Sequence, residues 1–245
     1  MEKEEYERMY NIEENFWWYR GLRDILFAYI EKEHSSDLKL LDAGCGTGKF
    51  LELCGDYQTF GLDFSPEAMH FSRLRNLKNL VRASVTHIPF GCDYFNIVTS
   101  MDVLYHMSIE NDRTAIKEFY RVLNKGGILI LNLPAYDFLK STHDKAIHTG
   151  HRYNREEVKE KVEEAGFNIE ILTYRNFFLF PLAFIMRFLK KFFLDSKDKT
   201  KSDLDAPPEF INKILFYILF MENILIKHGI TLPAGLSIFC VARKI

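Results

Sequence analysis

Residues Leu38 to Gly48 read LKLLDAGCGTG, and this stretch decides the fold. The leucines in its first half are typical of a short buried strand, which Asp42 closes. Glycines at alternate positions then form a turn into the helical pattern of residues 49–54. Glycine suits such a turn because side chains would keep a ligand away from the backbone, and because the turn needs dihedral angles closed to other residues. The stretch therefore predicts a nucleotide-binding loop.

A second strand, residues 58–62, ends in Asp63. At the tip of the second strand of a doubly wound sheet, an acid accepts hydrogen bonds from ribose hydroxyls. The alternative is that Asp63 is a turn or capping residue. Ser65 and Pro66 already provide a cap and a first residue for the next helix. We therefore predict that Asp63 binds a ribose.

The segments LDAGCGTG (41–48) and GLDFS (61–65) resemble the first motif and the second-strand acid of class I S-adenosylmethionine-dependent methyltransferases. The resemblance implies an α/β, doubly wound sheet of seven mostly parallel strands, the seventh antiparallel. It also implies S-adenosylmethionine as cofactor and S-adenosylhomocysteine as product. A nicotinamide-binding domain is the weaker interpretation, because it would have a third glycine at Lys49 and lack the acid at Asp42. The cofactor contacts that we expect are Asp42, Gly44, Cys45, Gly46, Gly48, Asp63, Phe64, Ser84, Val85, Met101, Tyr19 and Arg20.

Two of these contacts come from the segment after the third strand, residues 80–83. Ser84 and Val85 stand in a loop similar to the family loop that holds the adenine. An acid often accepts from the adenine amino group there, and Ser84 occupies that position. A hydroxyl accepts the same bond more weakly, while Val85 offers its amide or packing.

The composition favours a globular chain in the cytoplasm. The chain has 245 residues, 47% of them hydrophobic, and a net charge of -2, which gives no general basic field for nucleic acid. We therefore expect no nucleic-acid partner. The four cysteines lack metal-type spacing, and no signal peptide precedes the acidic opening.

Residues 1–36 have a helical pattern that carries both tryptophans. The family resemblance makes this segment a lid over the cofactor and acceptor cleft, with Tyr19 and Arg20 closing over the cofactor. The equally open alternative is a helix that packs on the sheet through its aromatic side chains.

The fourth strand, residues 94–100, runs into Met101 and Asp102. In the family the end of this strand faces the transferred methyl group. Asp102 and His106 are four residues apart and would share a helical face. The stretch resembles the metal-binding Glu-x-x-Glu-His of quinone-pathway O-methyltransferases, but Tyr105 replaces the second acid, so we predict no metal. His106 is a candidate catalytic residue, and the alternative is packing or capping.

Residues 141–153 read STHDKAIHTGHRY and place three of the eight histidines within nine residues. Histidine is the usual general base near neutral pH. The candidate bases are His143 with Asp144, or His148, and a metal site that also includes His151 is the alternative. A polar surface loop is the third interpretation. The candidate acceptor contacts are Tyr105, His151, Arg152 and Tyr153.

Two apolar runs, residues 177–194 and 210–221, lie between the sixth strand (168–174) and the last (236–243). Charges interrupt or bracket both runs, so neither is predicted to span a membrane. They would cover an apolar acceptor pocket, touch a membrane surface or form a homodimer interface.

We therefore expect a single domain over residues 1–245, with the lid at 1–36, the cofactor-binding core at 37–175, an apolar helical insertion at 176–234 and the last strand at 235–245. The predicted function is methyl transfer to a small-molecule acceptor, with a lipid, an isoprenoid and a lipid-linked sugar as candidates. The alternative is a non-catalytic S-adenosylmethionine-binding or membrane-associated scaffold protein.

Overall fold

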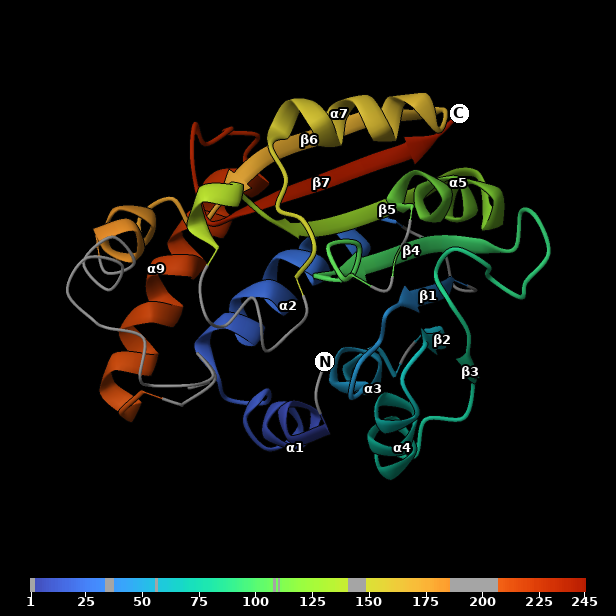
Figure 1. Ribbon diagram of the computed structural model, residues 1–245, viewed down its shortest axis with the longest axis horizontal. Helices are drawn as coiled ribbons and strands as arrows, with labels where there is room; N and C mark the ends of the chain where they lie inside the picture. Colours follow the sequence, from blue (N-terminus) through green and yellow to red (C-terminus); the bar gives the residue numbers. More distant parts are fainter. Residues whose placement is uncertain are drawn as a thin grey trace.

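The computed structural model describes residues 3–33, 38–55, 57–107, 109, 111–140, 149–185 and 207–245. Its centre is a seven-stranded sheet in the order β3-β2-β1-β4-β5-β7-β6 (Figure 1). The neighbours from β3 to β5 are parallel, and β7 is antiparallel to both β5 and β6. This confirms the expected doubly wound sheet with an antiparallel last strand. The strands are β1 (Lys39–Ala43), β2 (Gln58–Asp63), β3 (Leu80–Arg82), β4 (Phe95–Met101), β5 (Leu123–Pro134), β6 (Phe167–Arg175) and β7 (Ser237–Lys244).

Helices cover both faces of the sheet, and strand β5 shows why. Its leucines at 129, 131 and 133 enter one apolar cluster, and its isoleucines at 128 and 130 enter the other. Side chains alternate along a strand, so a continuous apolar run must be buried on both faces. The first cluster includes side chains of α5 and α7, and the second includes side chains of α2, α3 and α9. The helices are α1 (Lys3–Ile12), α2 (Trp17–Ile30), α3 (Lys49–Leu53), α4 (Pro66–Leu74), α5 (Asp112–Val122), α7 (Arg155–Glu164) and α9 (Glu209–Lys227).

The strand order reverses between β1 and β4, which lie side by side in the sheet. In open α/β sheets, ligands bind outside the carboxyl ends of the strands at such a point. Because β6 is antiparallel to β7, and β7 is antiparallel to β5, the last residue of β6, Arg175, reaches the same edge as Pro134 of β5. This carboxyl edge therefore collects the ends of β1, β2, β4, β5 and β6.

The chain becomes extended between α5 and β5 before it reaches the glycines at 126 and 127. The helix ends at Val122, and the strand begins at Leu123, which is extended and pairs with Phe95 of β4. Both Leu123 and Phe95 are fully buried. Their pairing in the core explains why the chain becomes extended before the glycines.

The apolar insertion is described in part. Residues 180–185 are helical, and α9 extends the predicted helix at 210–221 as far as Lys227. Helix α9 packs along α2 (Figure 1). A Cβ added to Gly21 of α2 would lie 2.7 Å from Cδ1 of Leu219, so glycine permits this close approach. Within the described ranges, no helix combines the length and apolarity that crossing a bilayer requires.

Candidate functional site

The glycine loop follows β1 in the conformation that its sequence predicts. Gly44, Gly46 and Gly48 have φ angles of 92°, 53° and 81°, in the region that favours glycine. A Cβ on Gly44 would lie 2.2 Å from Cγ2 of Val103, so that position has no room for a side chain. The amides of Gly44 and Cys45 donate to the carbonyl of Leu62, which ties the loop to the end of β2.

Asp63 lies at the end of β2 and holds the loop through its carboxylate. Its Oδ2 accepts from the amide of Gly46 over 3.0 Å, and its Oδ1 accepts from the amide of Ser65 over 2.9 Å. Burial raises the pKa of Asp63, and the backbone hydrogen bonds oppose that rise. A carboxylate offers about four acceptor sites, and the amides of Gly46, Ser65 and Phe64 act on Asp63, so about one site remains for a ligand.

Asp42 is buried one residue before the end of β1. Its Oδ1 accepts from the hydroxyl of Thr99 on β4 over 2.7 Å. Burial is the main reason that the pKa of Asp42 rises to about 7, and the nearby Asp63 adds to the rise. The side chain of Asp42 therefore links β1 to β4 beneath the glycine loop.

Some residues that are predicted to contact the cofactor have exposed side chains, and others have buried side chains. The ring of Phe64 is 63% exposed beside Asp63 and is free to lie against a base. The hydroxyl of Ser84 lies 2.8 Å from that of Thr86, so part of its hydrogen-bonding capacity is used. The side chains of Cys45 and Val85 are buried in the two apolar clusters and leave only their backbone for a cofactor.

A clasp that the sequence did not predict fastens the N-terminal segment to the glycine loop. Glu13, which follows α1, accepts from the hydroxyl of Thr47 and forms a 2.8 Å ion pair with Arg75. Arg75 also donates to the carbonyl of Thr47 over 3.0 Å. Cε of Met9 lies 2.9 Å from where a Cβ of Gly46 would be, so α1 lies directly over the loop. No local motif could reveal this clasp, because its three members are far apart in the chain.

Tyr19 and Arg20 are adjacent on α2 but face different surroundings. Burial raises the pKa of Tyr19, and the negative charges of Glu13 and Asp102 raise it further. The Tyr19 phenol is therefore near both the clasp and the end of β4. The guanidinium of Arg20 lies 4.0 Å from the ring centre of Phe216 on α9. This places Arg20 on the α9 side of the helix, and its predicted closure over the cofactor stays a prediction.

Asp102 follows β4 directly and is joined twice to Asn132 of β5. Its amide donates to the carbonyl of Asn132 over 2.9 Å, and its Oδ1 accepts from Nδ2 of Asn132 over 3.0 Å. Asp102 has a φ of 55°, a strained conformation for a residue other than glycine. Burial raises its pKa to about 6, although Asn132, Arg175 and Arg152 oppose the rise. A carboxylate with a pKa near the working pH is suited to general-base chemistry.

Among the predicted acceptor contacts, Tyr153 has a hydroxyl that is bonded within the protein, and its contact with an acceptor stays a prediction. Its hydroxyl is buried 3.0 Å from the carbonyl of Leu104 and 2.9 Å from Oδ2 of Asp112. These partners give Tyr153 a structural role, because its hydroxyl is used within the core. Burial and Asp112 accordingly raise its pKa.

His151 and Arg152 are near the carboxyl edge, with partners of their own. The His151 ring lies between Glu157, at 2.9 Å, and Asp137, at 3.4 Å. Arg152 is buried and donates to the carbonyl of Ala135 over 3.2 Å. His151 is thus held by two carboxylates. Of His151 and Arg152, Arg152 is the one whose positive charge acts on Asp102 and lowers its pKa.

Tyr105 and His106 lie in the turn after β4. The carbonyl of Tyr105 accepts from the amide of Gly150 over 2.8 Å. The backbone of His106 pairs with that of Thr149 in an isolated antiparallel β-bridge. The catalytic candidates His143, Asp144 and His148 lie outside the described residues. Within the described ranges, no cluster of three His, Cys, Asp or Glu side chains could hold a metal ion.

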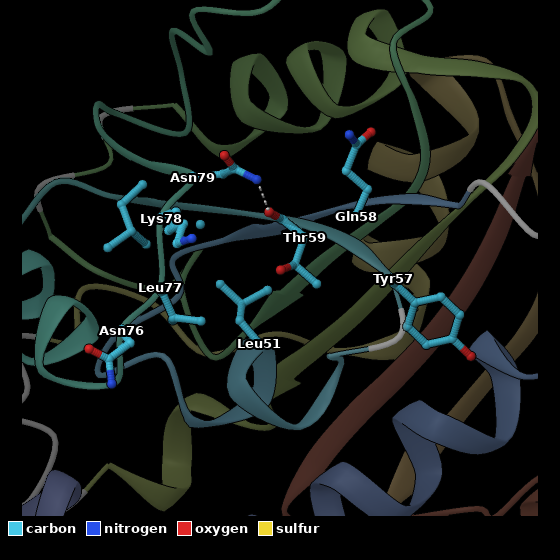
Figure 2. Close-up of a pocket in the computed structure, with 10 residues that line it drawn as sticks. Leu51, Tyr57, Gln58, Thr59, Asn76, Leu77, Lys78 and Asn79 are labelled. Carbon is cyan, nitrogen blue, oxygen red and sulfur yellow. Dashed lines mark hydrogen bonds between the residues drawn. The ribbon is translucent and has the colours of Figure 1, made fainter.

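A pocket of about 310 Å³ lies away from this site (Figure 2). Gln58 and Thr59 at the start of β2 line it together with residues 76–80, and Asn79 donates to the carbonyl of Thr59. Because it opens beside the first residues of β2, it is remote from the carboxyl edge where the acids gather.

Comparison with known proteins supports a methyltransferase domain around this site. Residues 41–131 match the family model for a methyltransferase domain. A bovine protein named probable tRNA methyltransferase 9B is 30% identical over 128 residues, which are 52% of this chain and 28% of that protein. The Arabidopsis thaliana tRNA (carboxymethyluridine(34)-5-O)-methyltransferase is 33% identical over 107 residues, which are 43% of this chain and 26% of that protein. The matched segments span about half or less of these and the other curated relatives.

The fold agrees with solved structures over a larger share of the chain. A Thermotoga maritima S-adenosylmethionine-dependent methyltransferase superposes with a TM-score of 0.61 at 15% identity and covers 99% of this chain and 95% of its own. Sheet order, glycine loop and second-strand acid together define a Rossmann-like methyltransferase domain. Residues 41–131 thus form a methyltransferase domain of the class I S-adenosylmethionine-dependent type, for which S-adenosylmethionine is the cofactor. The three glycines of the loop, which leave backbone open to a ligand, and the carboxylate of Asp63 fit that group.

Proposed function

We propose that the protein transfers a methyl group from S-adenosylmethionine to a small acceptor and that Asp102 is the general base. The observation that carries this proposal is the placement of Asp102 at the end of β4, beside the glycine loop. Its pKa of about 6 keeps it ionised near neutral pH yet basic enough to take a proton. The acceptor side of the edge is covered by α2 and α9, which favours a small molecule over a polymer.

The chain's own residues have three tasks in this reaction. The bound cofactor supplies an already activated methyl group, so alignment of the acceptor is the protein's main contribution. The glycine loop and Asp63 fix the cofactor, and Asn132 holds the Asp102 carboxylate in one orientation. Asp102 then accepts the acceptor proton as the new bond to the methyl group forms. Tyr19 and α1 cover the loop and limit the entry of water.

The exposed face of α9 supports a lipid-like acceptor and contact with a membrane surface. Phe210, Tyr217 and Met221 are 74%, 62% and 59% exposed and recur at helical spacing on one side of the helix. Ile214 lies on the same side and is also exposed. An exposed apolar face of this kind suits an interfacial location. Peripheral membrane contact, a cytoplasmic location and a homodimer remain predictions.

A tRNA nucleoside is the second candidate acceptor. The observation in its favour is that curated relatives are named as tRNA methyltransferases. The net charge of -2 provides less electrostatic attraction for a polynucleotide than RNA-binding proteins usually have.

The test is methyl transfer from tritium-labelled S-adenosylmethionine into three separate fractions of a cell extract: lipids, polar small molecules and total tRNA. We expect label in a small-molecule fraction and a loss of about 100-fold or more with Asp102→Asn. Label in tRNA alone would overturn the small-acceptor assignment, and label in no fraction would favour the non-catalytic scaffold.

A further inference from the structure

Arg175 is a fully buried cation with an unused hydrogen-bond donor. It ends β6, and its side chain is 0% exposed. Its Nε lies 3.4 Å from Oδ1 of Asn223, and its Nη1 lies 3.5 Å from Oδ1 of Asn132, both at the long limit of a hydrogen bond. Nη2 has no partner among the described residues. Leaving a charged donor buried and unpaired is costly, so the site calls for a further acceptor.

The nearby carboxylates do not supply that acceptor, because each has other partners. Glu222 accepts from the amides of Asn176 and Phe177. Asp24 accepts from Nδ2 of Asn223 over 2.9 Å and pairs with Lys227 over 3.0 Å. Asp102 accepts from Asn132, as described above. Within the described ranges, none of these carboxylates comes within 4.0 Å of the Arg175 guanidinium.

The free donor lies at the acceptor end of the site. Asp102, Asn132 and Arg175 follow one another along the carboxyl edge of β4, β5 and β6, linked by the Asn132 amide. The ring of Trp18 on α2 has its centre 6.0 Å from Cζ of Arg175. The guanidinium therefore lies beneath α2, and the side chain of Asn132 stands between it and the proposed base.

We propose that Arg175 binds a carboxylate of the acceptor through Nη2 and the adjacent edge of the guanidinium. The inference rests on the proposed function, since it assigns the chemistry of the acceptor at that same site. A planar carboxylate matches the guanidinium fork in a way that a single oxygen does not. A monoanion is favoured over a phosphate dianion because Asp102, Glu222 and Asp24 already make this region negative. The bound acceptor is thereby oriented with its reacting atom toward Asp102.

The test uses titration calorimetry on the full chain saturated with S-adenosylhomocysteine. Benzoate is the carboxylate probe, benzamide is its neutral isostere, and phenyl phosphate is the dianion. The variants are Arg175→Met and Arg175→Lys. Arg155→Met is the matched control, because Arg155 is partly exposed at the start of α7.

We expect wild-type protein and Arg155→Met to bind benzoate about 10-fold or more tighter than benzamide or phenyl phosphate. Arg175→Met should lose this preference, and Arg175→Lys should weaken benzoate binding about 10-fold, because lysine lacks the planar fork. Binding of S-adenosylhomocysteine should stay within about threefold in both variants, since Arg175 is at the acceptor end of the edge. If Arg175→Met does not fold, the benzoate affinity of Arg175→Lys tests the proposal.

Three results would overturn the inference: no benzoate binding by wild-type protein, equal binding of benzamide, or benzoate binding unchanged by substitution of Arg175. Tighter binding of phenyl phosphate would overturn the carboxylate assignment. A wild-type protein that binds no S-adenosylhomocysteine would instead refute the methyltransferase proposal, so the two failures are distinguishable.

Discussion

The amide of Gly46 donates a hydrogen bond to Oδ2 of Asp63 over 3.0 Å, so the glycine loop after β1 is held by the acid at the end of β2. The bond links two sequence motifs that are separated by a helix. Asp63 therefore shapes the loop, and its proposed second task is to accept from a ribose.

Asp63→Ala should weaken binding of S-adenosylhomocysteine by about 100-fold or more, because it removes both the ribose acceptor and the loop anchor. Titration calorimetry measures the effect. Asp93→Ala is the control, since Asp93 is 60% exposed and lies before β4, at the opposite edge of the sheet. Equal affinities for the two variants would contradict the assignment.

Asp102→Asn should lower turnover by about 10²- to 10⁴-fold and leave cofactor affinity nearly unchanged. The carboxylate must be ionised to act as a base, so the wild-type rate should rise with pH through about 6 and then level off. The variant should lack this rise. Rates measured from pH 5 to 8 with the acceptor found in the fractionation give the profile, and a wild-type rate that falls over this range would refute the role.

Glu13→Gln should loosen the N-terminal clasp, because it weakens the bonds to Thr47 and Arg75 in a buried setting. We expect S-adenosylhomocysteine to dissociate about 10-fold faster, as followed by stopped-flow tryptophan fluorescence. Glu14→Gln is a close control, since the adjacent Glu14 side chain is 66% exposed and reaches only Lys49, at 3.4 Å. The same dissociation rate in both variants would mean that the clasp does not retain the cofactor.

Asp42→Asn should change how stability depends on pH. Burial raises the folded-state pKa of Asp42 from 3.8 to about 7, so the folded protein binds the extra proton between these values. Ionisation of Asp42 therefore lowers the free energy of unfolding as pH rises through this window. Relative to wild type, the variant should gain stability from pH 4 to pH 7, by up to about 4 kcal/mol. Urea unfolding at several pH values measures the difference, and a constant difference would contradict the raised pKa.

Local pattern was sufficient for the sheet and for the cofactor side of the site. The apolar run in β5, the glycines at 44, 46 and 48 and the acid at 63 each act through backbone geometry or burial over a few residues. Such signals are present in the sequence itself. The start of α7 is another local feature, because the side chain of its cap, Asn154, accepts from the amide of Glu157.

The acceptor side depended on contacts that no local pattern encodes. The sequence could not show, for example, that the hydroxyl of Tyr153 is bonded to Leu104 and Asp112. No local sequence pattern assigned a role to Arg175 or Asn132, and only the pairing of β6 with β7 and of β7 with β5 brings them to one edge with Asp102.

The sequence by itself thus determined the class of fold, the glycine loop and the position of the acid that ends the second strand, because each is encoded in a short stretch of chain. Tertiary structure alone decided that burial raises the pKa of Asp102, that Arg175 keeps an unused donor and that Glu13 bonds to the loop. The physical reason is that desolvation and hydrogen-bond pairing depend on neighbours brought together by the sheet, often more than 30 residues apart in the chain.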